Sequence, residues 1–348
     1  MEKVGIITFL HNDNYGSSLQ AYALQRVIRE MGMDCEHLDY APDRAEKIRN
    51  LVRSRNHPKL ILEGMRKRQV RENQEGARAK GDSFPAFYRR RMRLSDPASN
   101  LRELRERSAE DTVLLCGSDQ IWNPVWLNPA YFLTFGLEQR KVAYAASLGV
   151  STLPPKGKAR KIRRWTADFQ AISVREEEGA RLFQQMTGRQ AEVMPDPVCL
   201  LSRAEWEEIA ESSPLAEPYL LCYFIGENPA YWERVQQLKA ETGWKTLVLP
   251  VTAESFSQGD QVLEGMGPEG FLGAVRGAAC FCTDSFHGFV FGTIFGVRTE
   301  VLRRYRDGDP ESKNSRIDQF QRMMKIMSLD EMRERGRRWL KGEVGSRR

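Results

Sequence analysis

The sequence predicts an α/β fold with two domains, and three observations support this prediction. The chain has 348 residues, which is more than one average domain needs. It begins with an apolar strand at residues 4–10, a helical pattern at 19–31 and a second strand at 35–40. A second series of this kind starts at Tyr219, where a strand precedes a helix at residues 231–242. Because strands joined by a helix usually pair in parallel, each series predicts a parallel sheet.

The composition is typical of a globular protein, with 41% hydrophobic and 29% charged residues. No apolar run approaches the length of a transmembrane helix, and the run at residues 4–10 is too short for a signal peptide. The six cysteines form no C-x-x-C pair, and most lie in apolar, strand-like runs, which predicts reduced core residues. We therefore expect a cytoplasmic protein.

The net charge of +6, from 53 Lys and Arg against 47 Asp and Glu, is distributed unevenly. Much of the excess lies between Arg44 and Arg93, within a charged, helical segment at about residues 41–110. A positive surface attracts nucleic acid, anionic lipid or a phosphorylated substrate. No nucleic-acid-binding motif accompanies it, so we expect no nucleic-acid partner. A solvated helical insertion is the simplest interpretation, and peripheral membrane contact is an alternative.

Polar or small residues follow several strands of the first series. They follow the strands at residues 4–10 and 112–116, and a run of small residues occupies 142–149. The strand at residues 171–174 is followed directly by Arg175 and Glu176. Because open α/β sheets bind ligands at the carboxyl ends of their strands, these positions are candidate ligand contacts. Arg175 suits a carboxylate or a phosphate, although a surface ion pair with Glu176 would also explain it.

The domain boundary is expected between residues 202 and 217, where a helix is followed by a connection that contains proline. This gives an N-terminal domain at 1–205, a C-terminal domain at 206–325 and a C-terminal helix and tail at 326–348. The charged end from Arg333 onward is expected to fray. The string at residues 265–270 matches G-x-G-x-x-G, but Pro268 and the lack of a ribose-binding acid argue against a dinucleotide site.

Residues 280–288 combine a buried strand with an acid, a hydroxyl and a histidine. The apolar, glycine-rich run that follows reads as a helix closed by Gly296, which places His287 in the first turn of a helix at a strand end. Free N–H groups at such a helix start favour an anion. His287 is therefore a candidate acid, base or ligand donor, and a structural histidine is the alternative. The four histidines show no helical metal-site spacing, so we expect no metal.

Several short segments form a set when they are taken in order. They include Gly-Ser-Asp-Gln-Ile-Trp-Asn at 117–123, Ser-Val-Arg-Glu at 173–176 and Thr-Asp-Ser-Phe-His-Gly at 283–288, with further segments at 14–16, 20–24, 144–147, 196–197 and 314–317. With these residues the chain resembles the polysaccharide pyruvyl transferase family. The resemblance covers nearly the whole chain except the segment 41–110 and the tail.

The resemblance implies two Rossmann-like domains that face a central cleft, as in glycosyltransferase-B folds. It also implies transfer of a pyruvyl group from phosphoenolpyruvate to sugar hydroxyls of a cell-surface polysaccharide or its lipid-linked precursor, which forms a pyruvate ketal and releases phosphate. Phosphoenolpyruvate would be the donor substrate and a saccharide the acceptor, and no cofactor is expected. A sugar-nucleotide-dependent glycosyltransferase of the same shape is an alternative, because a fold does not fix a function.

The family's histidine falls on His287, and the arginine of its Ser-Val-Arg signature falls on Arg175. Relatives often carry an arginine two residues before the histidine, where this chain has Ser285, so we expect Arg175 and Arg316 to hold the donor. Asp284 is expected to hold the imidazole. Further substrate contacts are expected from polar and small residues of the matching segments, namely Asn14, Tyr15, Gly16, Ser118, Asp119, Asn123, Ser147, Ser285, Asn314 and Ser315.

The expected mechanism begins with a protonated His287, which would donate a proton to the methylene carbon of phosphoenolpyruvate. A sugar hydroxyl would attack the resulting cation, phosphate would leave, and a second hydroxyl would close the ketal. A third possibility is a non-catalytic protein that binds anions or a membrane surface through residues 44–93, with binding that survives the loss of His287.

Overall fold

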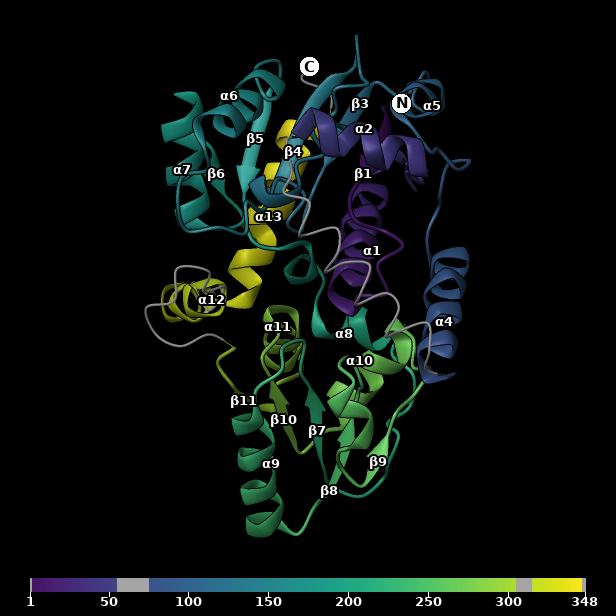
Figure 1. Ribbon diagram of the computed structural model, residues 1–348, viewed down its shortest axis with the longest axis vertical. Coiled ribbons are helices and arrows are strands. Elements are labelled where there is room, and N and C mark those ends of the chain that lie inside the picture. Colours follow the sequence, from purple (N-terminus) through teal and green to yellow (C-terminus); the bar gives the residue numbers. More distant parts are fainter. Residues whose placement is uncertain (1, 55–74, 305–314, 346–348) are drawn as a thin grey trace. The chain divides into compact units, whose positions relative to one another are not determined.

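A computed structural model describes residues 2–54, 75–304 and 315–345 of the chain. The chain forms two compact units: unit 1 comprises Met1–Gly64, Tyr88–Leu200 and Met323–Arg348, and unit 2 comprises Met65–Phe87 and Leu201–Arg322. Each unit has one parallel sheet with helices, so the predicted α/β class with two parallel sheets is confirmed (Figure 1).

The sheet of unit 1 has six strands in the order β2-β1-β3-β4-β5-β6. Their bounds are β1 (Lys3–Ile7), β2 (Asp34–His37), β3 (Val113–Cys116), β4 (Arg140–Ala146), β5 (Ala171–Val174) and β6 (Glu192–Val193). All neighbouring pairs are parallel. The chain passes from β1 to β2 on one side and to β3 on the other. The strand order therefore reverses between β1 and β3, and ligands bind α/β sheets outside the carboxyl ends at such a point.

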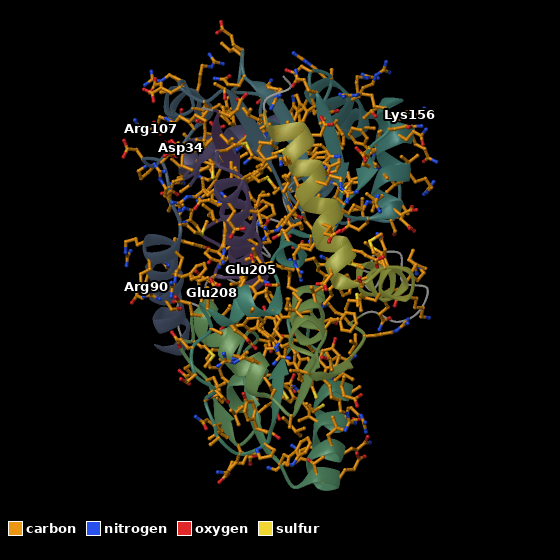
Figure 2. The ribbon with its side chains drawn as sticks, turned by 180° about the vertical axis from the view of Figure 1, so that it is seen from behind. Asp34, Arg90, Arg107, Lys156, Glu205 and Glu208 are labelled. Atoms are coloured by element: carbon orange, nitrogen blue, oxygen red, sulfur yellow. The ribbon has the colours of Figure 1, made fainter. Side chains whose placement is uncertain are left out.

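All described helices of unit 1 except the last connect these strands (Figure 1). The helices of this unit are α1 (Tyr15–Glu30), α2 (Arg44–Ser54), α5 (Leu101–Arg107), α6 (Lys156–Trp165), α7 (Glu177–Thr187) and α13 (Leu329–Val344), with 3-10 turns η1 (Pro124–Trp126), η2 (Pro129–Phe132) and η3 (Pro197–Leu200). Within the segment 41–110, helical character is confirmed for α2, for α5 and for α4 (Glu75–Arg91), which lies mainly in unit 2. Residues 55–74 of this segment lie outside the described residues. Charged side chains such as Arg107 and Lys156 lie at the surface of unit 1 (Figure 2).

The expectation that the chain frays from Arg333 onward is wrong. Helix α13 continues to Val344, and Met332, Trp339, Leu340 and Val344 are all buried. Trp339 donates from Nε1 to Glu192 at 2.6 Å. The buried residues recur at helical spacing, so the charged composition concealed an amphipathic helix that completes unit 1.

The sheet of unit 2 has five parallel strands in the order β11-β10-β7-β8-β9. The strands are β7 (Tyr219–Tyr223), β8 (Lys245–Val248), β9 (Gln261–Val262), β10 (Cys280–Thr283) and β11 (Arg298–Val301). The chain leads from β7 to β8 and β9 on one side, then returns to place β10 on the other side of β7. The strand order therefore reverses between β7 and β10.

The helices of unit 2 are α8 (Arg203–Glu207), α9 (Pro229–Thr242), α10 (Pro268–Gly277) and α11 (Phe286–Phe295), with the 3-10 turn η4 (Glu254–Ser257). Helix α12 (Ser315–Ile326) follows them along the chain. Local capping fixes several helix starts. Glu205 (Figure 2), for example, forms a reciprocal capping box with Ser202 at the start of α8. The interior contains aromatic pairs such as Trp206 and Phe291, whose ring centroids are 5.1 Å apart.

Candidate functional site

The strongest candidate site in unit 2 begins where β10 ends and α11 starts. Thr283 donates from its hydroxyl to the carbonyl of Tyr223 at 2.7 Å and accepts from the N–H of Ser285 at 3.1 Å. The hydroxyl of Ser285 then caps α11 by accepting from the N–H of Gly288 at 3.3 Å. A side chain at Gly288 would come within 2.6 Å of the Thr283 hydroxyl, so this close approach requires glycine. The cap fixes His287 in the first turn of α11, as the sequence predicted.

The imidazole of His287 lies in a mostly apolar setting. The residue is 9% exposed. Its ring packs edge-on against that of Phe286 with centroids 5.1 Å apart, and Phe286 in turn contacts the ring of Phe320 at 6.1 Å. This packing limits the rotamers of the histidine, while its position in the first helical turn leaves it close to N–H groups that favour an anion.

Asp284 connects the two strands at which the order of the sheet reverses. Its carboxylate accepts from the N–H groups of Ile225 at 2.7 Å and Gly226 at 2.8 Å, which follow β7. It also accepts from the hydroxyl of Tyr231 at 3.3 Å and from Nε of Arg304 at 2.7 Å. Four donors thus engage a carboxylate whose side chain is 0% exposed. Asp284 thus holds the loop after β7 and the side chain of Arg304 through hydrogen bonds, a role that the sequence did not predict. Its expected role in holding His287 stays a prediction.

Arg304 is a residue of this site that sequence reasoning missed. It follows β11 closely, and its terminal Nη2 donates to the backbone carbonyl of Asp284 at 3.4 Å. Its aliphatic stem covers Gly226, where a Cβ would come within 2.8 Å of the Arg304 Cγ. The side chain is 20% exposed. The sequence contained a signal for a residue at the carboxyl end of a strand, because two arginines directly follow the strand-like run at 297–302.

In unit 1, polar side chains meet where β1 and β3 end. Asn14 caps α1 by accepting from the N–H of Ser17 at 3.2 Å. The hydroxyl of Ser17 donates to Asp119 at 2.5 Å and accepts from the amide of Asn12 at 2.9 Å. The structure therefore brings the predicted residues Asn14 and Asp119 together. Ser17 and Asn12 join them, and they were missed although they lie in the same polar turn.

Gln20 is a second missed residue in this part of unit 1. Its side-chain oxygen accepts from the N–H of Ser118 at 2.9 Å, and its amide donates to the hydroxyl of Thr8 at 3.0 Å. These bonds fix the loop after β3 against α1. Tyr15 and Gly16, which were predicted to contact substrate, are the first two residues of α1, and both are buried.

Arg175 lies in a buried ion-pair network. Its Nε bonds to Glu176 at 3.0 Å and its Nη1 bonds to Asp196 at 2.6 Å, and its side chain is 3% exposed. Burial alone would lower the pKa of Arg175, but the two carboxylates outweigh it, so the pKa is raised. Ser147 and Ser118 donate to Glu176 at 2.8 Å and to Asp196 at 3.4 Å. The pair with Glu176 thus exists, inside the unit rather than on its surface.

Asn123 is also engaged by its own loop. Its side-chain oxygen accepts from the N–H of Val125 at 2.8 Å and its amide donates to Gln120 at 3.1 Å, so it caps η1. Of the residues expected near the C-terminal end, Arg316 is partly buried in α12. Asn314 lies outside the described residues, and so does the side chain of Ser315. The roles of all of these residues toward a substrate stay predictions.

Within residues 2–54, 75–304 and 315–345, no group of three or more His, Cys, Asp or Glu side chains could hold a metal ion. In that same part of the chain, every helix is too short or too polar to cross a membrane.

Sequence comparison decides the family. A model of the family described as polysaccharide pyruvyl transferase matches residues 14–302. The chain belongs to the polysaccharide pyruvyl transferase family. The matched range includes Arg175 and His287 and ends before Arg304 and Arg316. No curated protein sequence matches this family member.

Solved structures of sugar-nucleotide enzymes resemble this pyruvyl transferase family member in fold. UDP-N-acetylglucosamine 2-epimerase from Rickettsia bellii gives a TM-score of 0.55 at 9% identity, over 99% of this chain and 96% of that chain. The UDP-GlcNAc 2-epimerase from Methanocaldococcus jannaschii gives 0.50 at 11% identity, over 97% and 98%. E. coli heptosyltransferase WaaC gives 0.43 at 11% identity, over 94% and 99%. At such identities the first two show the fold alone, which is of the glycosyltransferase-B type.

Proposed function

We propose that this protein transfers a pyruvyl group from phosphoenolpyruvate to hydroxyls of a sugar in a cell-surface polysaccharide or its lipid-linked precursor, forming a pyruvate ketal. Membership of the polysaccharide pyruvyl transferase family supports the proposal. The observation that carries it is the position of His287, in the first turn of α11 beside the point where the strand order of unit 2 reverses. A proton donor and an anion-binding helix start are thereby close together.

The chemistry requires a proton at the methylene carbon of phosphoenolpyruvate. The protonated imidazole of His287 donates it, and the positive charge that develops at C2 is shared with the attached enol oxygen. A sugar hydroxyl adds to C2 and loses its proton to the imidazole. The C2–O bond to phosphate then breaks, and a second hydroxyl adds to C2 as its proton passes to phosphate. The products are a cyclic ketal and inorganic phosphate, and His287 ends in its starting state.

The negative charges of the donor need counter-charges. N–H groups in the first turn of α11 supply partial positive charge in unit 2. Arg175 and Arg316 are the arginines proposed from the sequence. Since two protein carboxylates surround Arg175, its charge is largely compensated before any ligand binds. Its contribution to donor binding would therefore be smaller than that of a less compensated arginine.

His287→Ala tests the proposal. We expect release of phosphate from phosphoenolpyruvate, in the presence of sugar acceptors, to fall by at least about a hundredfold, because loss of a general acid typically costs that much. Thr293→Ala, in the same helix, is the matched control and should keep wild-type turnover. A thermal melt of each variant checks folding. Turnover by His287→Ala at the wild-type rate would show that the imidazole is not the proton donor.

A sugar-nucleotide-dependent glycosyltransferase is the second candidate function. Its support is the fold, which this chain shares with enzymes whose structures are described as UDP-GlcNAc 2-epimerases. In that case the helix start of α11 would bind a nucleotide diphosphate instead of an enol phosphate.

A lipid-linked acceptor would lie at a membrane, and helix α2 offers a surface that suits contact with a membrane. Ile48 is 54% exposed and Val52 is 71% exposed, whereas Glu46 is 1% exposed on the same helix. Arg44 and Lys47 are exposed beside the two aliphatic side chains. Aliphatic side chains among cations suit an anionic lipid surface, so we propose peripheral membrane contact through α2.

A further inference from the structure

We propose that Arg304 binds the phosphate-bearing end of the donor substrate in unit 2. The identity of that donor, phosphoenolpyruvate, rests on the function proposed above. The role of Arg304 as a phosphate-binding residue rests on the geometry of unit 2 and can be measured separately.

The position of Arg304 in unit 2 suits a ligand contact. Arg304 follows β11, next to β10 in the sheet, so it lies at the carboxyl edge. Asp284 follows β10 directly and bonds to backbone N–H groups that follow β7. Through Asp284, Arg304 is attached to the two strands between which the strand order reverses. This is where a parallel α/β sheet forms its ligand crevice.

Hydrogen bonds hold the guanidinium of Arg304 in a fixed position. Asp284 receives three other donors, from Ile225, Gly226 and Tyr231, so Arg304 does not have to satisfy the carboxylate alone. Arg304 directs Nε to the carboxylate and Nη2 to the backbone carbonyl of the same residue, and these two bonds fix the plane of its guanidinium. A fixed, partly exposed guanidinium is suited to bidentate contact with phosphate oxygens.

The start of α11 carries no permanent positive charge on Ser285 or His287. Ser285 carries no charge, and its hydroxyl already caps α11. His287 supplies one proton but not a permanent charge. The helix start contributes partial charges only. An anion with two or three charges at this edge therefore needs a lasting cation, and Arg304 is bonded to the residue directly before Ser285.

Three variants test the role. Arg304→Gln removes the charge, Arg304→Lys keeps the charge without the fork, and Arg298→Gln removes an equal charge from the opposite, amino end of β11. Arg298 pairs with Glu300 and is 54% exposed, so it is a matched control. Dissociation constants for phosphoenolpyruvate and for UDP-GlcNAc are measured by calorimetry, and KM and kcat by phosphate release.

We expect Arg304→Gln to weaken phosphoenolpyruvate binding and raise KM by about ten- to hundredfold, with a much smaller change in kcat. Arg304→Lys should recover part of the affinity, and Arg298→Gln should match the wild type. A residue with a purely structural role would lower thermal stability without this separation of KM from kcat. Wild-type affinity in Arg304→Gln overturns the inference. If that variant does not fold, wild-type affinity in Arg304→Lys overturns it.

The outcomes also separate this inference from the proposed function. If phosphoenolpyruvate binds in a way that depends on Arg304 but is not turned over, pyruvyl transfer is contradicted. The phosphate-binding role of Arg304 is still supported in that case. If the wild-type protein binds UDP-GlcNAc but not phosphoenolpyruvate, and Arg304→Gln loses that binding, the phosphate-binding role is supported. The donor is then a sugar nucleotide instead of phosphoenolpyruvate. If the wild-type protein binds neither compound, the inference fails.

Discussion

At the scale of single residues, charged side chains of similar appearance in the sequence have different roles. Arg175 was expected to meet a ligand, yet two buried carboxylates compensate its charge. Arg304 was given no role, yet it lies at the carboxyl edge of a sheet and is 20% exposed. The difference is set by partners distant in sequence, such as Asp196 for Arg175, which no local pattern contains.

Asp111 allows a prediction at the same scale. It lies just before β3 and is 5% exposed, and neither carboxylate oxygen has a hydrogen-bond partner within the described residues. A Cβ at Gly5 would come within 2.2 Å of one of these oxygens, which shows how closely the backbone of β1 approaches. Burial raises the pKa of Asp111 to about 7; Lys3 opposes the shift, and Glu36 and Asp34 add to it.

Because the folded-state pKa lies above the ordinary value of 3.8, the folded protein holds this proton more tightly. The resulting stability is complete below pH 4, about the ordinary value, and is lost as pH rises through about 7. We expect Asp111→Asn to raise the free energy of unfolding at pH 8 by a few kcal/mol more than at pH 5, measured by urea titration. Glu110→Gln, which removes an exposed carboxylate paired with Lys3, should give no gain at pH 8. Equal gains for Asp111→Asn at both pH values would contradict the burial argument.

At the scale of elements, α13 and α2 show how composition can conceal structure. Both are strongly charged, and α13 nevertheless buries an apolar face in unit 1. Helix α2 is the reverse: Glu46 and Asn50 are buried, at 1% and 8%, and Ile48 and Val52 are exposed. Hydrophobic spacing identifies a helix in both cases. It does not reveal which face packs, because that depends on what the neighbouring strands and loops offer.

Substitution of Trp339 tests how much α13 contributes to the free energy of unfolding. It is 8% exposed, donates to Glu192, and packs its ring 5.6 Å from that of Tyr144. Trp339→Ala should lower the free energy of unfolding by about 3–5 kcal/mol, as for other buried tryptophans. Arg338→Ala, on the exposed face, should change it by less than about 0.5 kcal/mol. Denaturant titration compares the two. Equal effects would mean that α13 does not hold unit 1 together.

The exposed aliphatic residues of α2 test the membrane proposal. Sedimentation with vesicles of anionic phospholipid should retain the wild-type protein at low salt and release it at high salt. Ile48→Ser with Val52→Ser should reduce the bound fraction severalfold. Leu137→Ser, at a residue that is 71% exposed outside α2, is the control and should bind like wild type. Unchanged binding by the double variant would place the membrane contact elsewhere.

At the scale of the whole molecule, local sequence patterns predicted the two parallel sheets correctly, because strand, helix and strand follow one another within short distances. The helix start that carries His287 was predictable for the same reason, since Thr283, Ser285 and Gly288 act on their near neighbours. The bond of Asp284 to the loop after β7 was not, because it joins residues 59 positions apart. The expected central cleft stays a prediction.

Ligand stabilisation of the complete chain distinguishes the two candidate functions. A ligand that binds only the folded protein raises the melting temperature, by an amount set by its concentration relative to its dissociation constant. Pyruvyl transfer predicts a rise of several degrees with millimolar phosphoenolpyruvate and little change with UDP-GlcNAc. A glycosyltransferase predicts the opposite result. Inorganic sulfate at equal ionic strength is the control for general anion effects.

The return of α13 to unit 1 has a consequence for biosynthesis. Unit 2 ends at Arg322, whereas unit 1 includes Met323–Arg348. During translation, the sheet of unit 1 is synthesised before unit 2 and α13 is synthesised after it, so the earlier sheet must wait for a helix that follows the later one. Nascent chains interrupted before α13 would leave the apolar surface of the older half uncovered, and that half is where chaperones would be needed.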